Sequence, residues 1–256
     1  MTEAAAQPSA ICVGTAGWAI PGLVADRFGE AGTQLQRYAN ALRCTEINSS
    51  FRREHRAATY ARWAAATPPG FRFAVKLPHR ITHEGRLERV VAPLERFLDA
   101  VGELGDRLGP LLVQLPPSLA CAPRIASTFF GVLRRRFDGA VVCEPRDASW
   151  FDDAAERMLI RYRIGRVAAD PARVPAAARP GGWLGDSSKR GVAYFRWHGS
   201  PRVYWSSYGA ERIGQWAADV QDCAERSDCW CIFDNTASGA AAPNALELVA
   251  ELARRR

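Results

Sequence analysis

Residues 111–144 read LLVQLPPSLACAPRIASTFFGVLRRRFDGAVVCE and contain a strand, a helix and a second strand in one continuous stretch. Leu111–Gln114 and Ala140–Glu144 are short apolar runs of the kind that form strands. Between them, Ile125–Phe137 has the spacing of an amphipathic helix, and Pro123 stands where a first helical turn tolerates proline. Because a helix separates two strands, the stretch predicts a parallel sheet.

The same alternation continues in both directions along the 256 residues, and eight strand-like runs can be counted. No linker rich in Gly and Ser and no block of charge divides the chain, which argues against a doubly wound sheet with a second domain. Eight β/α units in about 250 residues match the usual size of a TIM barrel. The predicted fold is therefore α/β, a single TIM-type (β/α)8 barrel with a polar mouth at the C-terminal ends of its strands. The other six strand runs are Ile11–Gly14, Cys44–Asn48, Phe71–Lys76, Arg166–Ala169, Val192–Trp197 and Trp230–Asp234.

Amphipathic segments between these runs predict the helices of the barrel. The sixth unit is the exception, because Asp170–Lys189 is rich in Pro, Gly and Ala and is expected to form a long irregular loop. Ser149–Asp152 has the spacing of a capping box before the next helix. Besides Ile125–Phe137, the expected helices are Gln34–Leu42, Ala57–Ala66, Leu87–Leu108, Asp153–Tyr162, Glu211–Ala224 and Ala245–Ala253.

The composition, 48% hydrophobic and 24% charged with a formal charge of +7, excludes fibrous, collagen-like and acidic disordered proteins. No apolar run approaches the ~18 residues of a membrane-spanning helix, so no membrane contact is expected. The first ten residues lack the basic and apolar regions of a secretory signal and are expected to be a disordered N-terminus before a domain at residues 11–256. With seven Cys and no CxxC pair, reduced thiols and a cytoplasmic location are expected. The protein is also expected to be a monomer.

Alternation of side chains along barrel strands predicts which residues face the interior near each C-terminal end. In the third strand, Ala74 and Lys76 point inward, and in the seventh, Tyr194, Arg196 and His198 do so. The catalytic candidates at these ends are Glu46, Lys76, Glu144, His198 and Asp234. Lys76 carries most weight, because only two of the 34 basic residues are lysines, and a lysine can titrate or contact a phosphate as a point charge.

Residues at the strand ends and in the following loops are candidates for ligand binding. The loop GSPRVYWSSYG at 199–209 offers aromatic and basic groups that can stack on a base or sugar and neutralise a phosphate. An aromatic cluster that packs this loop on the barrel rim is the alternative interpretation. The full set of ligand-binding candidates is Trp18, Asn48, Gln114, Arg146, Arg196, Arg202, Tyr204 and Asn235.

Seven motifs occur in an order that resembles the YecE-like family, domain-of-unknown-function family 72, over about residues 11 to 251. The resemblance implies a TIM-type barrel with the motif residues at its C-terminal mouth, and it implies no established reaction. Asp147 stands where the family more commonly has histidine. The motifs are GTAGW (14–18), EINSSF (46–51), FAVKLPHRITH (73–83), QLPPS (114–118), EPRDASWF (144–151), RWHG (196–199) and FDNTASGAAAPNA (233–245).

The leading functional hypothesis is an enzyme that acts on a phosphate-bearing or other anionic ligand, with nucleic acid among the candidate ligands and phosphoester hydrolysis, the reaction of a hydrolase, as one candidate reaction. Lys76 and the arginines would hold the anion, the carboxylates would act as general base or acid, and His198 would shuttle a proton. A glycoside-processing enzyme and a non-enzymatic protein that binds nucleic acid or another partner are the alternatives.

The sequence specifies no cofactor and no metal motif. If a divalent metal takes part, Glu46, Glu144 and Asp234 are its expected oxygen ligands. His79 and His83 are four residues apart, but no third ligand lies near them in the sequence.

Overall fold

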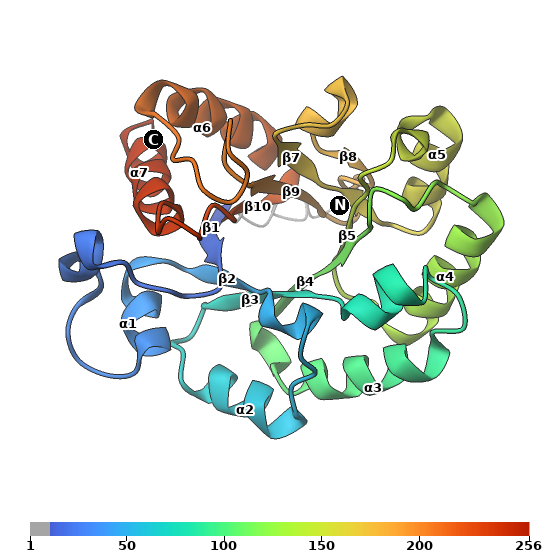
Figure 1. The fold of residues 1–256 in the computed structure, drawn as a ribbon, viewed down its shortest axis with the longest axis horizontal. Helices are drawn as coiled ribbons and strands as arrows, with labels where there is room; N and C mark the ends of the chain where they lie inside the picture. Colours follow the sequence, from blue (N-terminus) through green and yellow to red (C-terminus); the bar gives the residue numbers. More distant parts are fainter. Residues whose placement is uncertain (1–10, 256) are drawn as a thin grey trace, which may run out of the picture.

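The sheet places strands that follow one another in sequence side by side and parallel, as the strand–helix–strand pattern predicts (Figure 1). This computed structural model describes residues 11–255, so the predicted disordered segment at 1–10 lies outside the described residues. β9 and β10 pair with each other, and β10 pairs with β1, which brings the chain back to its first strand. The main parallel strands are β1 (Ile11–Ala16), β2 (Cys44–Ile47), β3 (Arg72–Lys76), β4 (Leu108–Gln114), β5 (Val141–Glu144), β9 (Gly191–Trp197) and β10 (Ser227–Phe233).

Closure of the barrel depends on the predicted sixth strand, which is divided in two. β6 (Gly165–Arg166) pairs with β5, β7 (Ala168–Asp170) pairs with β9, and Val167 lies between them. A short antiparallel strand, β8 (Gly181–Gly182), pairs with β6 and completes a sheet of ten strands. The sheet is therefore a nearly closed barrel.

The predicted α/β barrel is confirmed in this form, but an eightfold β/α count is not. The segment after β7 contains β8 and a 3-10 turn, η6 (Pro175–Ala178), where a regular unit would have an α-helix. Glycine is required at Gly182, because its φ is +65° and a Cβ there would lie 2.4 Å from the backbone oxygen of Ile164. The segment that is rich in Pro, Gly and Ala thus contains the 3-10 turn η6 and then β8, which pairs antiparallel with β6.

The helices lie outside the sheet and surround it (Figure 1). The predicted helix Leu87–Leu108 is wrong at both ends: Arg86, Leu87 and Arg89 have positive φ angles, and the helix itself ends at Gly102. The helices are α1 (Gln34–Ala41), α2 (Ala57–Ala65), α3 (Val91–Gly102), α4 (Pro123–Arg136), α5 (Asp153–Arg161), α6 (Ala210–Ala224) and α7 (Ala241–Arg254).

The start of α5 differs from the predicted capping box. Asp152 itself is the N-cap, and its side chain accepts a hydrogen bond of 2.7 Å from the backbone N–H of Ala155. Ser149 belongs to the preceding 3-10 turn η5 (Ala148–Phe151), where both its backbone N–H and its hydroxyl donate to Asp147. A single carboxylate at the helix end replaces the reciprocal pair because an Asp side chain reaches that N–H directly.

Two apolar layers sit on the two faces of the sheet, and they follow the predicted alternation. Phe73 and Val75 of β3 pack in the outer layer against the helices, whereas Ala74 belongs to the inner layer that fills the barrel. On β9, Tyr194 faces inward and Phe195 outward. Because this parity holds up to the strand ends, the polar residues that continue it face the barrel mouth.

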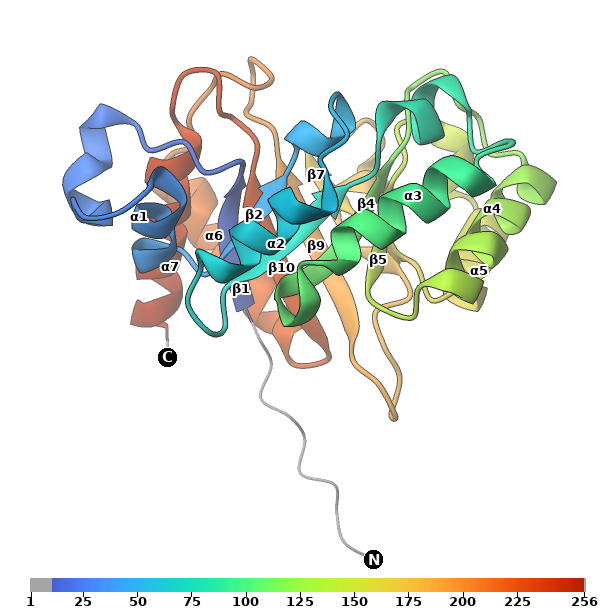
Figure 2. The same cartoon turned by 90° about the horizontal axis from the view of Figure 1, so that it is seen from below.

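The parallel arrangement places the loops that follow the strands at one end of the barrel, opposite the end at which β1 begins (Figure 2). Within residues 11–255, no helix has the length and apolar character needed to cross a bilayer. All seven cysteines are free, as expected for reduced thiols.

Candidate functional site

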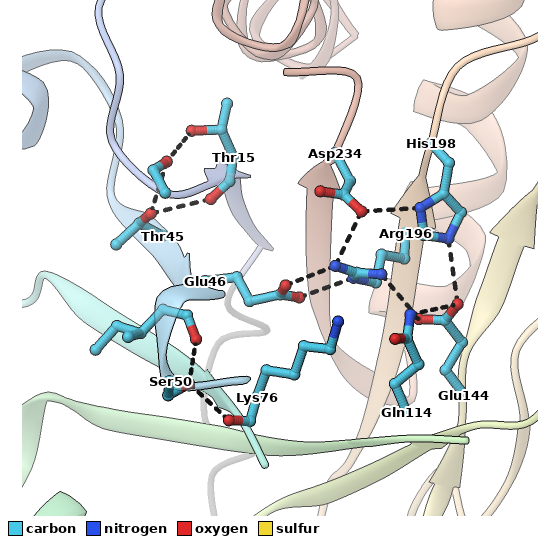
Figure 3. Close-up of polar contacts among 12 residues, drawn as sticks. Thr15, Thr45, Glu46, Ser50, Lys76, Gln114, Glu144, Arg196, His198 and Asp234 are labelled. Atoms are coloured by element: carbon cyan, nitrogen blue, oxygen red, sulfur yellow. Dashed lines mark hydrogen bonds and ion pairs between the residues drawn. The ribbon is translucent and has the colours of Figure 1, made fainter. Parts of the chain in front are cut away.

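A charged cluster at the C-terminal ends of the strands is organised around Arg196 (Figure 3). Arg196 is the penultimate residue of β9 and is only 1% exposed. Its Nε and Nη2 donate to the two carboxylate oxygens of Glu46 at 3.0 and 2.8 Å. Nη1 donates to Glu144 at 3.1 Å, and Nη2 lies 3.0 Å from Asp234. Burial opposes the charge of Arg196, but the three carboxylates outweigh it and raise the pKa of the guanidinium well above its usual value.

We call the group that this geometry brings together the mouth cluster. It draws on β2, β3, β4, β5, β9 and the residues that follow β5, β9 and β10. Its members are Glu46, Lys76, Gln114, Glu144, Arg146, Arg196, His198 and Asp234, and Figure 3 labels all of them except Arg146. All eight are candidates from the sequence analysis.

His198 lies between two carboxylates of the mouth cluster. Its Nδ1 is 2.9 Å from Asp234 Oδ2, and its Nε2 is 3.2 Å from Glu144 Oε1. Burial disfavours the imidazolium, yet Glu144 and Asp234 together raise the pKa of His198 above its usual value. Two ionised acceptors require two N–H donors, so this geometry suits the protonated ring.

Glu144 is the most heavily bonded carboxylate of the mouth cluster. Besides Arg196 and His198, it accepts hydrogen bonds from Gln114 at 3.2 Å and from Arg146 at 2.9 and 3.1 Å. Burial alone would raise the pKa of Glu144, but Arg146, Arg196 and His198 hold it well below its usual range. Glu144 therefore stays ionised at neutral pH and serves as a fixed negative charge.

Lys76 is different, because its ammonium has no hydrogen bond or ion pair with any of residues 11–255. It is 6% exposed, and Nζ lies 3.9 Å from the centre of the Phe51 ring, a cation–π distance. Its stem points toward the mouth cluster from β3 (Figure 3). Burial and the nearby Arg196 lower the pKa of Lys76 to about 8, against the opposite influence of the three carboxylates. Lys76 thus holds a proton that it can lose near neutral pH.

A pocket of about 170 Å³ opens beside Glu144 and His198. Arg146, Arg173 and Tyr204 line it, and the side chain of Arg146 is 21% exposed. The ring of Tyr204 meets that of His198 edge to face at 5.7 Å.

A neighbouring histidine reports the electrostatic potential of this end of the barrel. Burial lowers the pKa of His83 to about 4, and the neighbouring His79, Lys76 and Arg146 lower it further. Lys76 and Arg146 thus both act on a third residue at this end of the barrel.

Five of the predicted ligand-binding residues lie outside the mouth cluster, and one of them, Tyr204, lines the pocket beside it. Trp18 packs edge-on against Trp63 and Phe73 in the outer layer, at 5.1 and 6.5 Å between ring centres. Asn48 precedes the 3-10 turn η2 (Ser49–Phe51) and makes no side-chain cap there. The remaining two belong to or anchor the loop between β9 and α6. They are Arg202, which stacks on Trp205 at 4.5 Å, and Asn235, whose amide donates to Ser206 O and Asn244 Oδ1, both at 2.9 Å.

Two further residues of the site were not named as candidates. Tyr194 donates to Glu46 at 2.9 Å, and its inward parity on β9 was a usable signal. Arg173 lines the pocket from the irregular segment after β7, and no periodic pattern in that segment could have indicated its place.

The expected metal ligands have other partners. Glu46, Glu144 and Asp234 surround a guanidinium, and within the described part of the chain no three or more His, Cys, Asp or Glu side chains are arranged to hold a metal ion. His79 and His83 stack on each other with ring centres 5.2 Å apart, which is a packing contact.

A family model described as a protein of unknown function, DUF72, matches residues 12–256. The chain belongs to the DUF72 family. The UPF0759 protein YecE of Escherichia coli K12 is 31% identical to this DUF72 chain over 178 residues, 66% of the chain and 62% of YecE, so the chain spans less than two thirds of that relative's length. The UPF0759 protein YunF of Bacillus subtilis strain 168 is 22% identical over 270 residues, 93% of each protein.

Two crystal structures of DUF72 proteins have the same fold. The protein from Thermotoga maritima MSB8 superposes with a TM-score of 0.76 at 24% identity and covers 95% of this chain and 99% of its own. The protein from Enterococcus faecalis V583 gives a TM-score of 0.76 at 20% identity over 95% of each chain. These DUF72 structures share the barrel fold of this chain.

Proposed function

We propose that the barrel mouth is the active site of an enzyme that binds a small anionic substrate, one bearing a phosphate or a carboxylate, between Lys76 and Arg146. The observation that carries this proposal is Lys76, a residue only 6% exposed whose ammonium has no acceptor among residues 11–255. A nearly buried cation without a partner is unfavourable, and an anionic group bound beside it would remove that penalty.

The charge balance of the mouth cluster supports an anionic ligand. The cluster holds three carboxylates, the guanidinium groups of Arg146 and Arg196, the ammonium of Lys76 and the imidazole of His198. Both ring nitrogens of His198 face carboxylates, which suits its protonated form, and Lys76 with a pKa of about 8 is largely protonated at pH 7. The four cationic groups then outnumber the three carboxylates by one. One anionic group would neutralise the mouth, and the positive charges of Lys76 and Arg146 favour its approach.

In this proposal, each residue has a separate task. Arg146 faces the pocket and has guanidinium N–H groups beyond those that bond Glu144, so it can hold the anion. Glu144 and Asp234, whose pKa values are lowered, remain ionised, and together with Glu46 they fix Arg196 and His198 in place. Lys76 is the group that can change its charge during the reaction, because its pKa of about 8 lets it hold or lose a proton near neutral pH.

The pKa values argue against a glycoside-processing enzyme. Such an enzyme needs a carboxylic acid that keeps its proton near neutral pH. Glu144 and Asp234 have pKa values below their usual ranges, because Arg196 and His198 outweigh their burial. Neither is suited to protonate a leaving group.

Binding of single-stranded nucleic acid is a second candidate, supported by the loop between β9 and α6. Trp205 is 46% exposed there and carries Arg202 on its ring at 4.5 Å, an arrangement that can stack on a base. Binding of a fluorescent oligonucleotide that weakens steeply with salt and is lost in Trp205→Ala would support this candidate.

Anion binding can be tested by thermal unfolding with added inorganic phosphate, with chloride at equal ionic strength as the reference. A ligand that binds only the folded state raises the unfolding temperature. We expect phosphate to raise it in the wild type and in Lys189→Met, whose lysine is exposed, and not in Lys76→Met. Equal shifts in Lys76→Met and the wild type would contradict the proposal. Turnover of phosphorylated and carboxylated metabolites, lost in Lys76→Met, would then identify the reaction.

A further inference from the structure

The choice of lysine at position 76 is itself informative. Of the 34 basic residues, 32 are arginine, and the only lysines are Lys76 and Lys189. In the mouth cluster, Arg146 and Arg196 make all the ion pairs that involve a guanidinium or ammonium group. A guanidinium stays protonated and is a poor nucleophile, whereas a primary amine can lose its proton and attack a carbonyl carbon.

The surroundings of Lys76 suit a nucleophile. The residue is 6% exposed, and its Nζ lies 3.9 Å from the centre of the Phe51 ring and has no hydrogen-bond partner within residues 11–255 that would occupy its lone pair. At a pKa of about 8, about a tenth of Lys76 is neutral at pH 7. Charged and titratable groups face it from several elements. They are Glu46 on β2, His83 on the π-helical turn Arg80–Glu84, Glu144 on β5, Arg196 on β9 and Asp234 after β10.

We propose that Lys76 forms a Schiff base with the carbonyl carbon of a small aldehyde or ketone that also carries a phosphate or carboxylate. This inference rests on the proposed function and specifies its substrate class: the anionic group binds at Arg146, and the carbonyl reaches Nζ.

The step balances without an oxidant or a reductant. The lone pair of neutral Nζ forms the N–C bond while the carbonyl π electrons move to oxygen, and a proton passes from nitrogen to that oxygen to give a carbinolamine. The C–O bond then breaks, and the oxygen leaves as water with the second proton of Nζ. One amine and one carbonyl thus give one imine and one water.

The mouth cluster is suited to hold the product. A protonated imine carries its positive charge at the position of the former ammonium. Glu46, Glu144 and Asp234 already face that position, and their attraction to positive charge there opposes the lowering of the pKa of Lys76. The cluster therefore stabilises the iminium without rearrangement of the carboxylates.

Trapping with borohydride tests the inference. Because the sequence has only two lysines, the position of an adduct can be assigned to Lys76 or to Lys189. The full chain is incubated with glyoxylate or glycolaldehyde phosphate, reduced, digested and mapped by mass spectrometry. Neutral glycolaldehyde serves as the reference probe. We expect the adduct at Lys76 to exceed that at exposed Lys189 by roughly tenfold or more with the anionic probes, because an ordinary exposed lysine is almost fully protonated at pH 7.

Variants and competition distinguish this inference from the proposed function. Lys189→Arg should leave trapping at Lys76 unchanged, whereas inorganic phosphate and Arg146→Met should reduce it. If phosphate stabilises the folded protein through Lys76 but Lys76 is trapped no faster than Lys189, the anion site stands and the Schiff base is refuted. If phosphate neither stabilises the protein nor competes with trapping at Lys76, the proposed anion site fails, and a trapped imine would then be independent of it.

Discussion

Removal of the Arg196 side chain tests whether the mouth cluster is a network of buried ion pairs. Arg196→Met leaves Glu144 with Arg146 and His198, and Asp234 with His198, so Glu46 is the carboxylate that loses its cation. The expected cost is therefore that of one broken buried pair, about 3–5 kcal/mol, and not three times that value. Within residues 11–255, Glu46 would retain only the hydrogen bond from the Tyr194 hydroxyl at 2.9 Å.

Urea unfolding of matched variants measures this cost. Arg136 donates to Glu95 at 2.6 Å, but those side chains are 32% and 45% exposed, so Arg136→Met should cost less than about 1 kcal/mol. Adding Glu46→Gln to Arg196→Met should recover part of the loss, because it removes the unpaired charge. Equal costs for Arg196→Met and Arg136→Met, or no recovery in the double variant, would refute the network.

Two further predictions concern the groups around the cluster. Since the pKa of His198 is raised by folding, its stabilising contribution is complete below about pH 6.5 and is lost as pH rises through the raised value. The stability advantage of the wild type over His198→Gln, measured by urea unfolding, should therefore shrink toward alkaline pH, and an advantage that grows would contradict this. Buried Asn244 bonds the backbone N–H and C=O of Tyr208 at 3.1 and 3.0 Å, so Asn244→Ala should cost about 1–3 kcal/mol in the same assay. The exposed Asn40→Ala should stay within about 0.5 kcal/mol, and equal costs would show that this anchor contributes nothing.

The sequence predicted the inner side chains of the barrel well, because strand geometry alone determines them. Successive residues of a strand point to opposite faces, so the apolar outer run of β3 implied that Lys76 faces inward. The same parity placed Arg196 and His198 on one face of β9 and the strand's continuation. Parallel strands bring their C-terminal ends to one edge of the sheet. Glu46 and Asp234 could therefore be assigned to one site although 188 positions separate them in the sequence.

Parity could not predict which groups bond to each other or how the loops pack. The pairing of Arg196 with three carboxylates depends on distances across the barrel, which no local pattern contains. Trp18 looked available for a ligand because its partner Trp63 lies on α2, far along the chain. Asn235 was a plausible ligand-binding amide, but Asn244 and Ser206 use its N–H groups. Loop residues of the right chemical type thus need the tertiary contacts before a role can be assigned.

The distribution of hydrogen bonds within the mouth cluster narrows the choice of the group that changes state during a reaction. Glu144 and Asp234 have lowered pKa values and Arg196 a raised one, so none of the three exchanges a proton near neutral pH. His198 titrates closer to neutrality, but both of its ring nitrogens face carboxylates, and a proton leaves it only at the cost of one of those contacts. Lys76 has no such contact within residues 11–255 and a pKa of about 8. The neighbouring groups therefore keep their charges near neutral pH, and the amine of Lys76 is the group that can gain or lose a proton during a reaction.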